Sequence, residues 1–180
     1  MVLKDFSVSG KQAIVVGGAR GIGRGIALTL AEAGADVAIV ALTERAVFDV
    51  ATRASGYGVL AKAYTADATD GDAMDVTARA VLSDFPNLSI VVNSVGDSLR
   101  QPVITLPDKP EAVGMASADW HRILNINLTS VFEGCRVFAS HLIQRKDGVV
   151  INVSGVRAYR PLPFGSLGRL LAPPPLSHFL

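Results

Sequence analysis

The sequence lacks the features that would place a protein outside the cell or in a membrane. Cys135 is the single cysteine among 180 residues, so no disulfide can form within the chain, which is typical of a reducing compartment. The opening Met-Val-Leu-Lys-Asp-Phe-Ser places a charge pair where a signal peptide needs an apolar core. No apolar run approaches the roughly 18 residues of a membrane helix. We therefore expect a cytoplasmic protein.

The chain also lacks an excess of charge of either sign. It has 17 Lys and Arg against 16 Asp and Glu, which gives a formal net charge of +1. Nucleic acids and anionic membranes attract proteins through a strong basic excess, so we expect neither as a partner. With 49% hydrophobic residues, a chain of this length can build the core of one domain.

What the sequence does contain is a repeated alternation of strand and helix patterns. Apolar runs predict strands at residues 12–16, 36–42, 59–65, 88–93 and 148–154. Helical patterns lie between them, at residues 21–33, 43–55, from Thr69 or Asp70 to about Phe85, and 117–145. The first predicted helix has Ile22, Ile26 and Leu30 on one face. Such alternation predicts an α/β fold, a doubly wound parallel sheet with its ligand crevice at the carboxyl ends of the strands.

The segment from Ala13 to Gly25 predicts where a ligand would lie. A β-branched strand enters a glycine-rich turn and continues as a helix, with glycines at positions 17, 21 and 23. Glycine permits the tight turn and lets backbone N–H groups approach a pyrophosphate, which the partial positive charge of the helix N-terminus also attracts. We interpret this turn as a dinucleotide site; the alternative is an open α/β sheet that binds no nucleotide.

The turn reads Val16-Gly-Gly-Ala-Arg-Gly-Ile-Gly, and it resembles the Thr-Gly-x-x-x-Gly-Ile-Gly motif of the classical short-chain dehydrogenase/reductase family. The resemblance covers about residues 8 to 156. It implies a Rossmann-type sheet, incomplete at the C-terminus, in which Gly17, Gly21, Ile22 and Gly23 bind a nicotinamide dinucleotide. Val16 replaces the usual threonine, but all three glycines of the motif are present.

Two further turns resemble cofactor-binding segments of this family. Asp67 follows the third predicted strand, where the family's aspartate meets the adenine, and Ala68 would add a backbone contact. The alternative is an aspartate that caps a helix or faces solvent. The family's Asn-Asn-Ala-Gly turn appears as Asn93-Ser-Val-Gly96, which keeps its first and last residues. In the family this turn supports the sheet and borders the ribose.

Asn127 matches the asparagine that holds a water in the family's proton relay. It lies in the segment 120–132, within an apolar helical stripe that includes Leu124, Val131 and Cys135. The alternative is a core asparagine whose amide is satisfied by backbone groups. We assign no metal ligands in this chain.

The end of the second predicted strand indicates which nucleotide is preferred. NAD-dependent relatives place Asp or Glu there to bind the ribose hydroxyls, whereas this chain has Ala41. No carboxylate at that position would repel a 2′-phosphate, and Arg20 in the glycine turn is placed to pair with one. Arg45 either adds to this charge or is simply exposed. We favour NADP(H) over NAD(H).

The catalytic segment departs from the family pattern. The family's Asn-x-Ser-Ser aligns with Asn152-Val-Ser-Gly, so the catalytic serine position falls on Gly155. Ser154 is a candidate substitute, but a shift of one residue on a strand turns a side chain to the other face. The family's Tyr-x-x-x-Lys pair is missing, because Pro163 stands four residues after Tyr159.

The last residues differ in composition from the rest. Five of the nine prolines fall between Pro161 and Pro175, and no acidic residue follows Asp147. We therefore expect a dinucleotide-binding domain at residues 1–156 and an irregular Pro-rich tail at 157–180, and we interpret the chain as a truncated or frameshifted reductase.

Two function classes follow from these observations. The first is an NAD(P)-dependent oxidoreductase acting on a ketone or secondary alcohol, with this chain inactive or impaired. The second is a non-catalytic nucleotide-binding protein or inactive fragment. Family members pair through the long helix and the one after it, and only the first is predicted here, which argues against that route to a homo-oligomer.

Overall fold

The computed structural model describes residues 7–99, 101–105 and 113–155. They belong to two compact units, one of residues 1–96 with 125–153 and one of residues 97–124 with 154–180. The predicted tail 157–180, including Tyr159, lies outside the described residues. The proposed domain boundary at residue 156 therefore stays a prediction.

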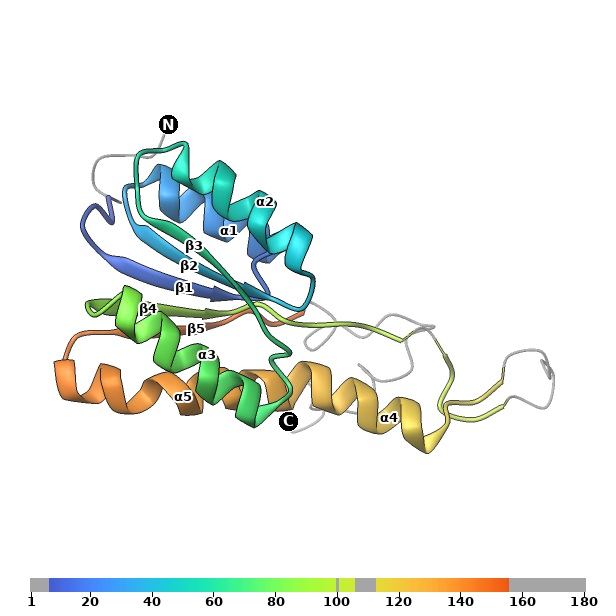
Figure 1. Cartoon of the computed structure of the whole chain (residues 1–180). Helices are drawn as coiled ribbons and strands as arrows, with labels where there is room; N and C mark the ends of the chain where they lie inside the picture. The colour runs from blue at the N-terminus through green and yellow to red at the C-terminus, as the bar shows by residue number, and fades with distance from the viewer. Residues whose placement is uncertain (1–6, 100, 106–112, 156–180) are drawn as a thin grey trace, which may run out of the picture. The chain divides into compact units, whose positions relative to one another are not determined.

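The first unit contains a parallel five-stranded sheet in the order β3-β2-β1-β4-β5 (Figure 1). Its strands are β1 (Gln12–Val16), β2 (Asp36–Ala41), β3 (Ala61–Thr65), β4 (Leu88–Asn93) and β5 (Val149–Asn152). All five predicted strands are confirmed, with β2, β3 and β5 shorter than expected.

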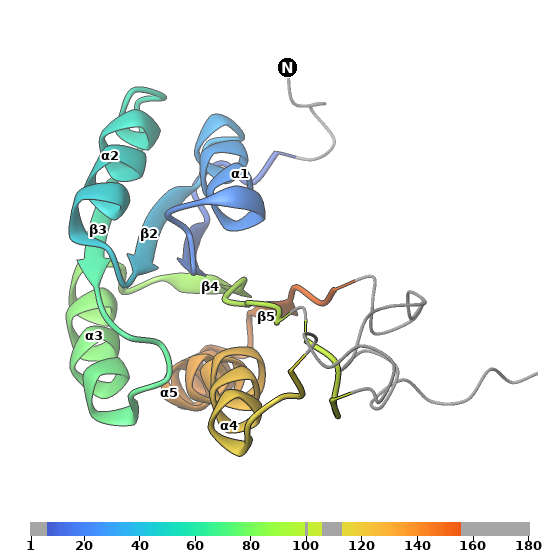
Figure 2. The ribbon, with the colours of Figure 1, turned by 90° about the vertical axis from the view of Figure 1, so that its right-hand side faces the viewer.

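Helices of the first unit cover both faces of the sheet. The helices are α1 (Gly21–Glu32), α2 (Glu44–Ser55), α3 (Gly71–Asp84) and α5 (Ser130–Arg145). Figure 2 shows α1 and α2 on one face and α3 and α5 on the other. The Asp70 carboxylate accepts a hydrogen bond from Ala73 N at 3.1 Å, so Asp70 is the cap of α3. The predicted doubly wound α/β fold is confirmed.

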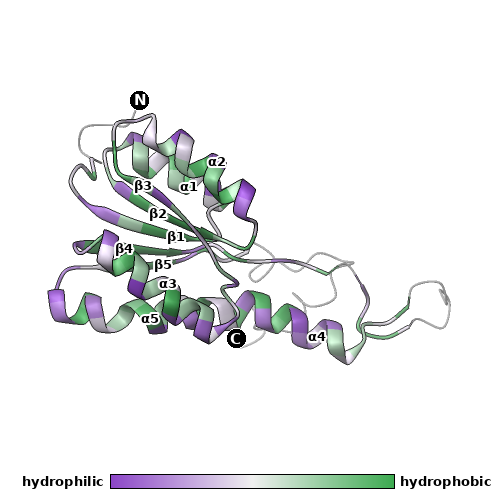
Figure 3. Cartoon of the chain, in the orientation of Figure 1, coloured by the Kyte–Doolittle hydropathy of each residue, from purple (hydrophilic) through white to green (hydrophobic). Residues whose placement is uncertain are grey.

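Alternate residues of the central strands supply two hydrophobic cores. Val15, Val37 and Ile39 pack toward α1 and α2, whereas Ile14, Val16 and Val40 pack in the cluster that includes α3 and α5 residues. Figure 3 shows the strands in the middle of the sheet as largely hydrophobic. A strand buried on both faces needs apolar residues at every position, which is the continuous pattern of the sequence.

The buried face of α1 agrees only in part with the predicted one. Small residues at positions 23, 27 and 31 are buried, whereas the Ile22 side chain is 67% exposed. Small side chains let the helix approach the sheet closely. The apolar spacing in the sequence thus located the helix correctly, and Ile26 and Leu30 of the predicted face pack against the core, whereas Ile22 does not.

The predicted helix 117–145 is divided in the structure. It forms α4 (Ser117–Leu124), a π-helical turn (Asn125–Thr129) and α5. The second unit contains α4, where Arg122 Nη1 pairs with Asp97 Oδ2 at 3.1 Å. None of the helices in the described ranges is both long and apolar enough to span a bilayer.

The strand order places a switch point between β1 and β4. The chain runs outward from β1 through β2 to β3, then returns to place β4 on the other side of β1. Connections leaving neighbouring strands toward opposite faces open a crevice at their carboxyl ends, where ligands of such sheets bind. The turns at Gly17 and Ser94 leave these two strand ends.

Candidate cofactor site

The glycine turn after β1 packs directly against the turn after β4. Gly17 has φ +85°, and a Cβ there would lie 2.7 Å from the backbone oxygen of Ser94. A Cβ at Gly23 would meet the carbonyl oxygen of Gly17. Glycine is required at both positions, at the first by conformation and close packing and at the second by packing. The turn is tight because the backbone of Gly17 packs directly against the backbone of Ser94.

Beside this packed turn, the start of α1 presents free space and unused backbone donors. A Cβ at Gly21 would meet nothing within 4 Å. Within the described chain no side chain caps the start of α1, and its first turn holds no acidic residue. An uncapped helix start leaves N–H groups and a partial positive charge directed outward. The turn and helix start thus fit an anionic group such as a pyrophosphate.

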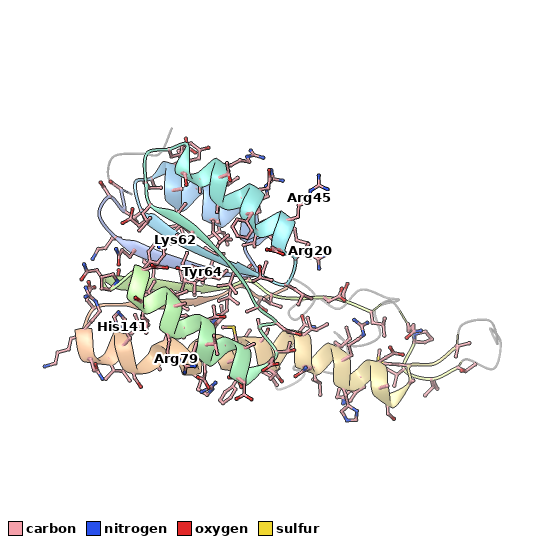
Figure 4. The ribbon with its side chains drawn as sticks, viewed as in Figure 1. Arg20, Arg45, Lys62, Tyr64, Arg79 and His141 are labelled. Carbon is pink, nitrogen blue, oxygen red and sulfur yellow. The ribbon has the colours of Figure 1, made fainter. Side chains whose placement is uncertain are left out.

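Positive charge surrounds the same end of the domain. Arg20 and Arg45 are exposed, and Figure 4 shows both at the end of the domain where α1 and α2 begin. Neither guanidinium has an ion pair with another described residue. Ala41 ends β2 without a carboxylate, although Glu44 begins α2 nearby in sequence. The described groups leave Arg20 available to an anionic ligand.

At the end of β4, Asn93 is 1% exposed and joins three elements. Its Nδ2 donates to Asn152 Oδ1 at 2.9 Å, on β5, and lies 3.5 Å from Cys135 Sγ on α5. A Cβ at Gly134 would collide with Asn93 Oδ1. These contacts hold the ends of two strands to the helix below them, and the predicted contact of Asn93 with a cofactor stays a prediction.

The structure brings two predicted site residues together at Gly96. A Cβ on Gly96 would lie 3.2 Å from Asn127 Oδ1, so the turn after β4 contacts the π-helical turn. Asn127 is exposed. The expectation of a continuous helical stripe around Asn127 is wrong, because the π turn changes the phase of the helix there. Such turns interrupt helices frequently at functional sites.

Asp67 and Ala68 lie in the turn after β3. The Asp67 Oδ1 accepts hydrogen bonds from Thr69 N at 2.9 Å and Thr69 Oγ1 at 2.8 Å. Asp67 is exposed and Ala68 is 7% exposed. The carboxylate therefore shapes its own turn through one oxygen, so contact with an adenine amino group would use the other.

The end of β5 is the least enclosed part of the candidate site. All four residues of β5 are exposed, and Ser154 and Gly155 are exposed beyond its end. The strand stops at Asn152, so the strict alternation of faces expected to reach Ser154 does not apply. Asn152 is the first residue of the segment that resembles the family's Asn-x-Ser-Ser. Its hydrogen bond to Asn93 depends on the pairing of β5 with β4, which the sequence does not indicate.

The turn packing of Ser94 was likewise not foreseen. In the comparison with the family's Asn-Asn-Ala-Gly turn, Ser94 is only a residue that differs from the pattern. In the structure, Gly17 packs against its backbone. A signal was present, because a doubly wound sheet places the fourth strand beside the first and so brings their following turns together.

A match to a family model confirms the family that the glycine turn predicts. The model described as short chain dehydrogenase matches residues 11–167. The chain belongs to the short-chain dehydrogenase family.

Individual relatives agree with this assignment. Over 160 residues the chain is 34% identical to a 2-dehydro-3-deoxy-D-gluconate 5-dehydrogenase of Pseudoalteromonas atlantica, a match that covers 88% of this chain and 59% of the relative. A metagenomic short-chain oxidoreductase solved in complex with NADP superposes with a TM-score of 0.79 at 28% identity, covering 92% of this chain and 71% of that one.

An NAD⁺-bound xylitol dehydrogenase superposes with a TM-score of 0.78 at 26% identity, covering 87% of this chain and 57% of that one. The chain therefore spans 59% of the length of the gluconate dehydrogenase of Pseudoalteromonas atlantica. Solved relatives thus include one with NADP and one with NAD⁺.

Proposed function

We propose that the chain binds NADP(H) and derives from an oxidoreductase that transfers hydride between this cofactor and a ketone or secondary alcohol. The observation on which the proposal rests is the glycine turn, whose open side at Gly21 adjoins an uncapped helix start and the exposed Arg20. The absence of a carboxylate at Ala41 favours the phosphorylated nucleotide.

The residues present divide the cofactor among three turns. The N–H of Gly17 donates to Val40 O at 2.8 Å, so Gly17 would only permit the close approach of the pyrophosphate, and the helix start at Gly21 and Gly23 would offer the N–H groups. Arg20 would pair with the 2′-phosphate. Asp67 and Ala68 would contact the adenine, and Asn93 and Gly96 would border the ribose. Ile22, 67% exposed, presents an apolar surface beside the turn and contributes little to the core. When bound, the cofactor supplies or accepts the hydride.

Asn127 and Ser154 are the proposed catalytic positions, for a water and for the substrate oxygen. Neither residue replaces the general acid of the family. The amide of Asn127 does not exchange a proton near neutral pH, and the hydroxyl of Ser154 needs a nearby base or cation to do so. Pro163 stands four residues after Tyr159, where the family's Tyr-x-x-x-Lys pair has its lysine. This favours a second candidate function, a nucleotide-binding protein without turnover. We propose a cytoplasmic location and a small carbonyl or alcohol as the substrate of the oxidoreductase.

The cofactor proposal is tested by Arg20→Ala in fluorescence titrations with NADPH and NADH. NADPH affinity should fall about tenfold or more, since a charge-assisted pair with phosphate is lost, and NADH affinity should change little. Arg53→Ala is the matched control, because Arg53 is exposed in the last turn of α2. Equal losses for both nucleotides would contradict the assignment.

Turnover is tested separately, by following NADPH oxidation with a panel of ketones. We expect binding without turnover. Measurable reduction that disappears in Ser154→Ala would favour the catalytic alternative and assign the substrate oxygen to that hydroxyl.

A further inference from the structure

The outer edge of β3 has backbone groups that are directed away from the sheet. Val37 N donates to Leu60 O at 2.8 Å, and Ala66 N donates to Ala41 O at 3.1 Å. A parallel ladder uses alternate residues, so positions 60, 62, 64 and 66 face β2. The N–H and C=O groups of Ala61, Ala63 and Thr65 therefore point outward, and the described sheet has no strand beyond them.

This edge lies in a groove that is open to another chain. The groove has a volume of about 380 Å³ and extends from α2, through β3, to Asp84 at the end of α3. Its alanines are Ala51 on α2 and Ala61 and Ala63 on β3, and Phe48 in the same groove is 52% exposed. Exposed edges of this kind pair with further strands unless charge or a covering segment prevents it.

The one charged side chain of β3 does not protect the edge. Lys62 Nζ pairs with Asp84 Oδ1 at 2.6 Å, and Tyr64 Oη donates to Asp84 Oδ2 at 2.6 Å. Figure 4 shows Lys62 and Tyr64 labelled together at this strand. The lysine charge is thus compensated within the chain, which removes the repulsion that an edge lysine usually provides.

We propose that β3 pairs antiparallel with β3 of a second copy, around a twofold axis beside Ala63. In this register Ala63 opposes Ala63, and Ala61 opposes Thr65, so every outward N–H and C=O finds a partner. Lys62 then lies opposite Tyr64 of the second copy, near that copy's Asp84. A shift that sets Lys62 opposite Lys62 is disfavoured because the outward groups of Thr65 would then lie beyond the end of the partner strand. The two sheets become one continuous sheet.

A disulfide test examines this register directly. Paired residues that exchange both hydrogen bonds have Cα atoms about 5.5 Å apart, within the range that a disulfide spans. Ala63→Cys should therefore form a covalent dimer on mild oxidation. Thr65→Cys is the matched control, because its counterpart across the axis is Ala61, and it should remain monomeric. Peptide mapping distinguishes this disulfide from one through Cys135. The unsubstituted chain, oxidised in the same way, shows how much dimer Cys135 forms by itself.

Sedimentation velocity of the full chain tests the assembly without cross-linking. Ala63→Pro removes an outward N–H and leaves the ladder to β2 intact, so self-association should weaken by about tenfold or more. Val150→Pro makes the same change on the outer side of β5 and should leave the dimer unchanged. A monomer at all concentrations, or dissociation by Val150→Pro alone, would overturn the proposal, as would a Thr65→Cys link that forms as readily as the Ala63→Cys link.

Discussion

The carboxyl ends of β1 and β5 are built in different ways. Ala13 to Val16 are fully buried, and the turn that follows packs backbone against backbone at Gly17. Val149, Val150 and Ile151 of β5 are 48%, 39% and 46% exposed, and the following Ser154 is exposed as well. Where backbones pack this closely, only glycine fits, and there the glycines of the family motif are kept. Where the strand end is open, packing imposes little, and there the motif is altered.

The largest effect is expected from Gly17→Ala. A non-glycine residue at φ +85° stores strain of about 1–3 kcal/mol, and overpacking against Ser94 adds a similar amount, so the chain should lose about 3 kcal/mol or more of stability. Urea unfolding measures this loss. Gly25→Ala is the control, because a Cβ there meets nothing within 4 Å and the residue is helical, so it should stabilise the chain by about 0.5–1 kcal/mol. Equal effects would remove the contrast between a packed and an open position.

A smaller effect is expected from Asn152→Ala, although Asn152 is exposed. The change removes the 2.9 Å acceptor of the buried Asn93 amide and should cost about 1–2 kcal/mol. The double variant with Asn93→Leu should recover part of that loss, since the stranded donor is then also gone. A double-mutant cycle by urea unfolding measures the coupling. Strictly additive losses would show that the end of β5 does not depend on β4.

The pH dependence of stability should arise at β3 more than at β5. Hydrogen bonds from Lys62 and from Tyr64 lower the pKa of the Asp84 carboxyl. A carboxyl with a lowered pKa in the folded state stabilises that state above its unfolded pKa, and this contribution is lost as pH falls through the folded value. Burial and the Asp84 charge raise the pKa of Tyr64 above its usual range, so the tyrosine stays a proton donor.

Asp84→Asn should therefore flatten the loss of stability that begins as pH falls to the ordinary aspartate pKa of about 3.9, measured by urea unfolding. Asp147→Asn, just before β5, should change it less, because the Lys11–Asp147 pair is half exposed on both sides. If Asp84→Asn loses stability at low pH as the unsubstituted chain does, the pH dependence of stability arises from other groups.

The smallest effect is expected from Ser154→Ala. An exposed side chain beyond a strand end contributes little, so stability should change by less than about 0.5 kcal/mol. The same titration that detects NADPH should show unchanged affinity. A loss comparable to that of Asn152→Ala would mean that the end of β5 is as tightly held as the end of β1.

The sequence predicted the elements well because their signals are local. Continuous apolar runs such as Ile90-Val-Val identified the strands, and glycine at position 21 marked the start of a helix within one residue. The predicted face of α1 is correct at Ile26 and Leu30 but not at Ile22, and the small residues that are fully buried in this helix give no hydrophobic signal. The π turn around Asn127 was missed because its residues, Asn-Ile-Asn-Leu-Thr, match an α-helical pattern equally well.

By itself the sequence determined the alternation of strands and helices along the chain, the doubly wound parallel class of the sheet, and the glycine turn that identifies the family. These follow from residue periodicity and from backbone conformations that only glycine adopts readily. Only the tertiary structure decided that Ser94 supports Gly17, that Asn152 satisfies Asn93, and that Ala61, Ala63 and Thr65 face outward. Such relations join strands far apart in the chain, and pairing geometry, which no local pattern encodes, sets them.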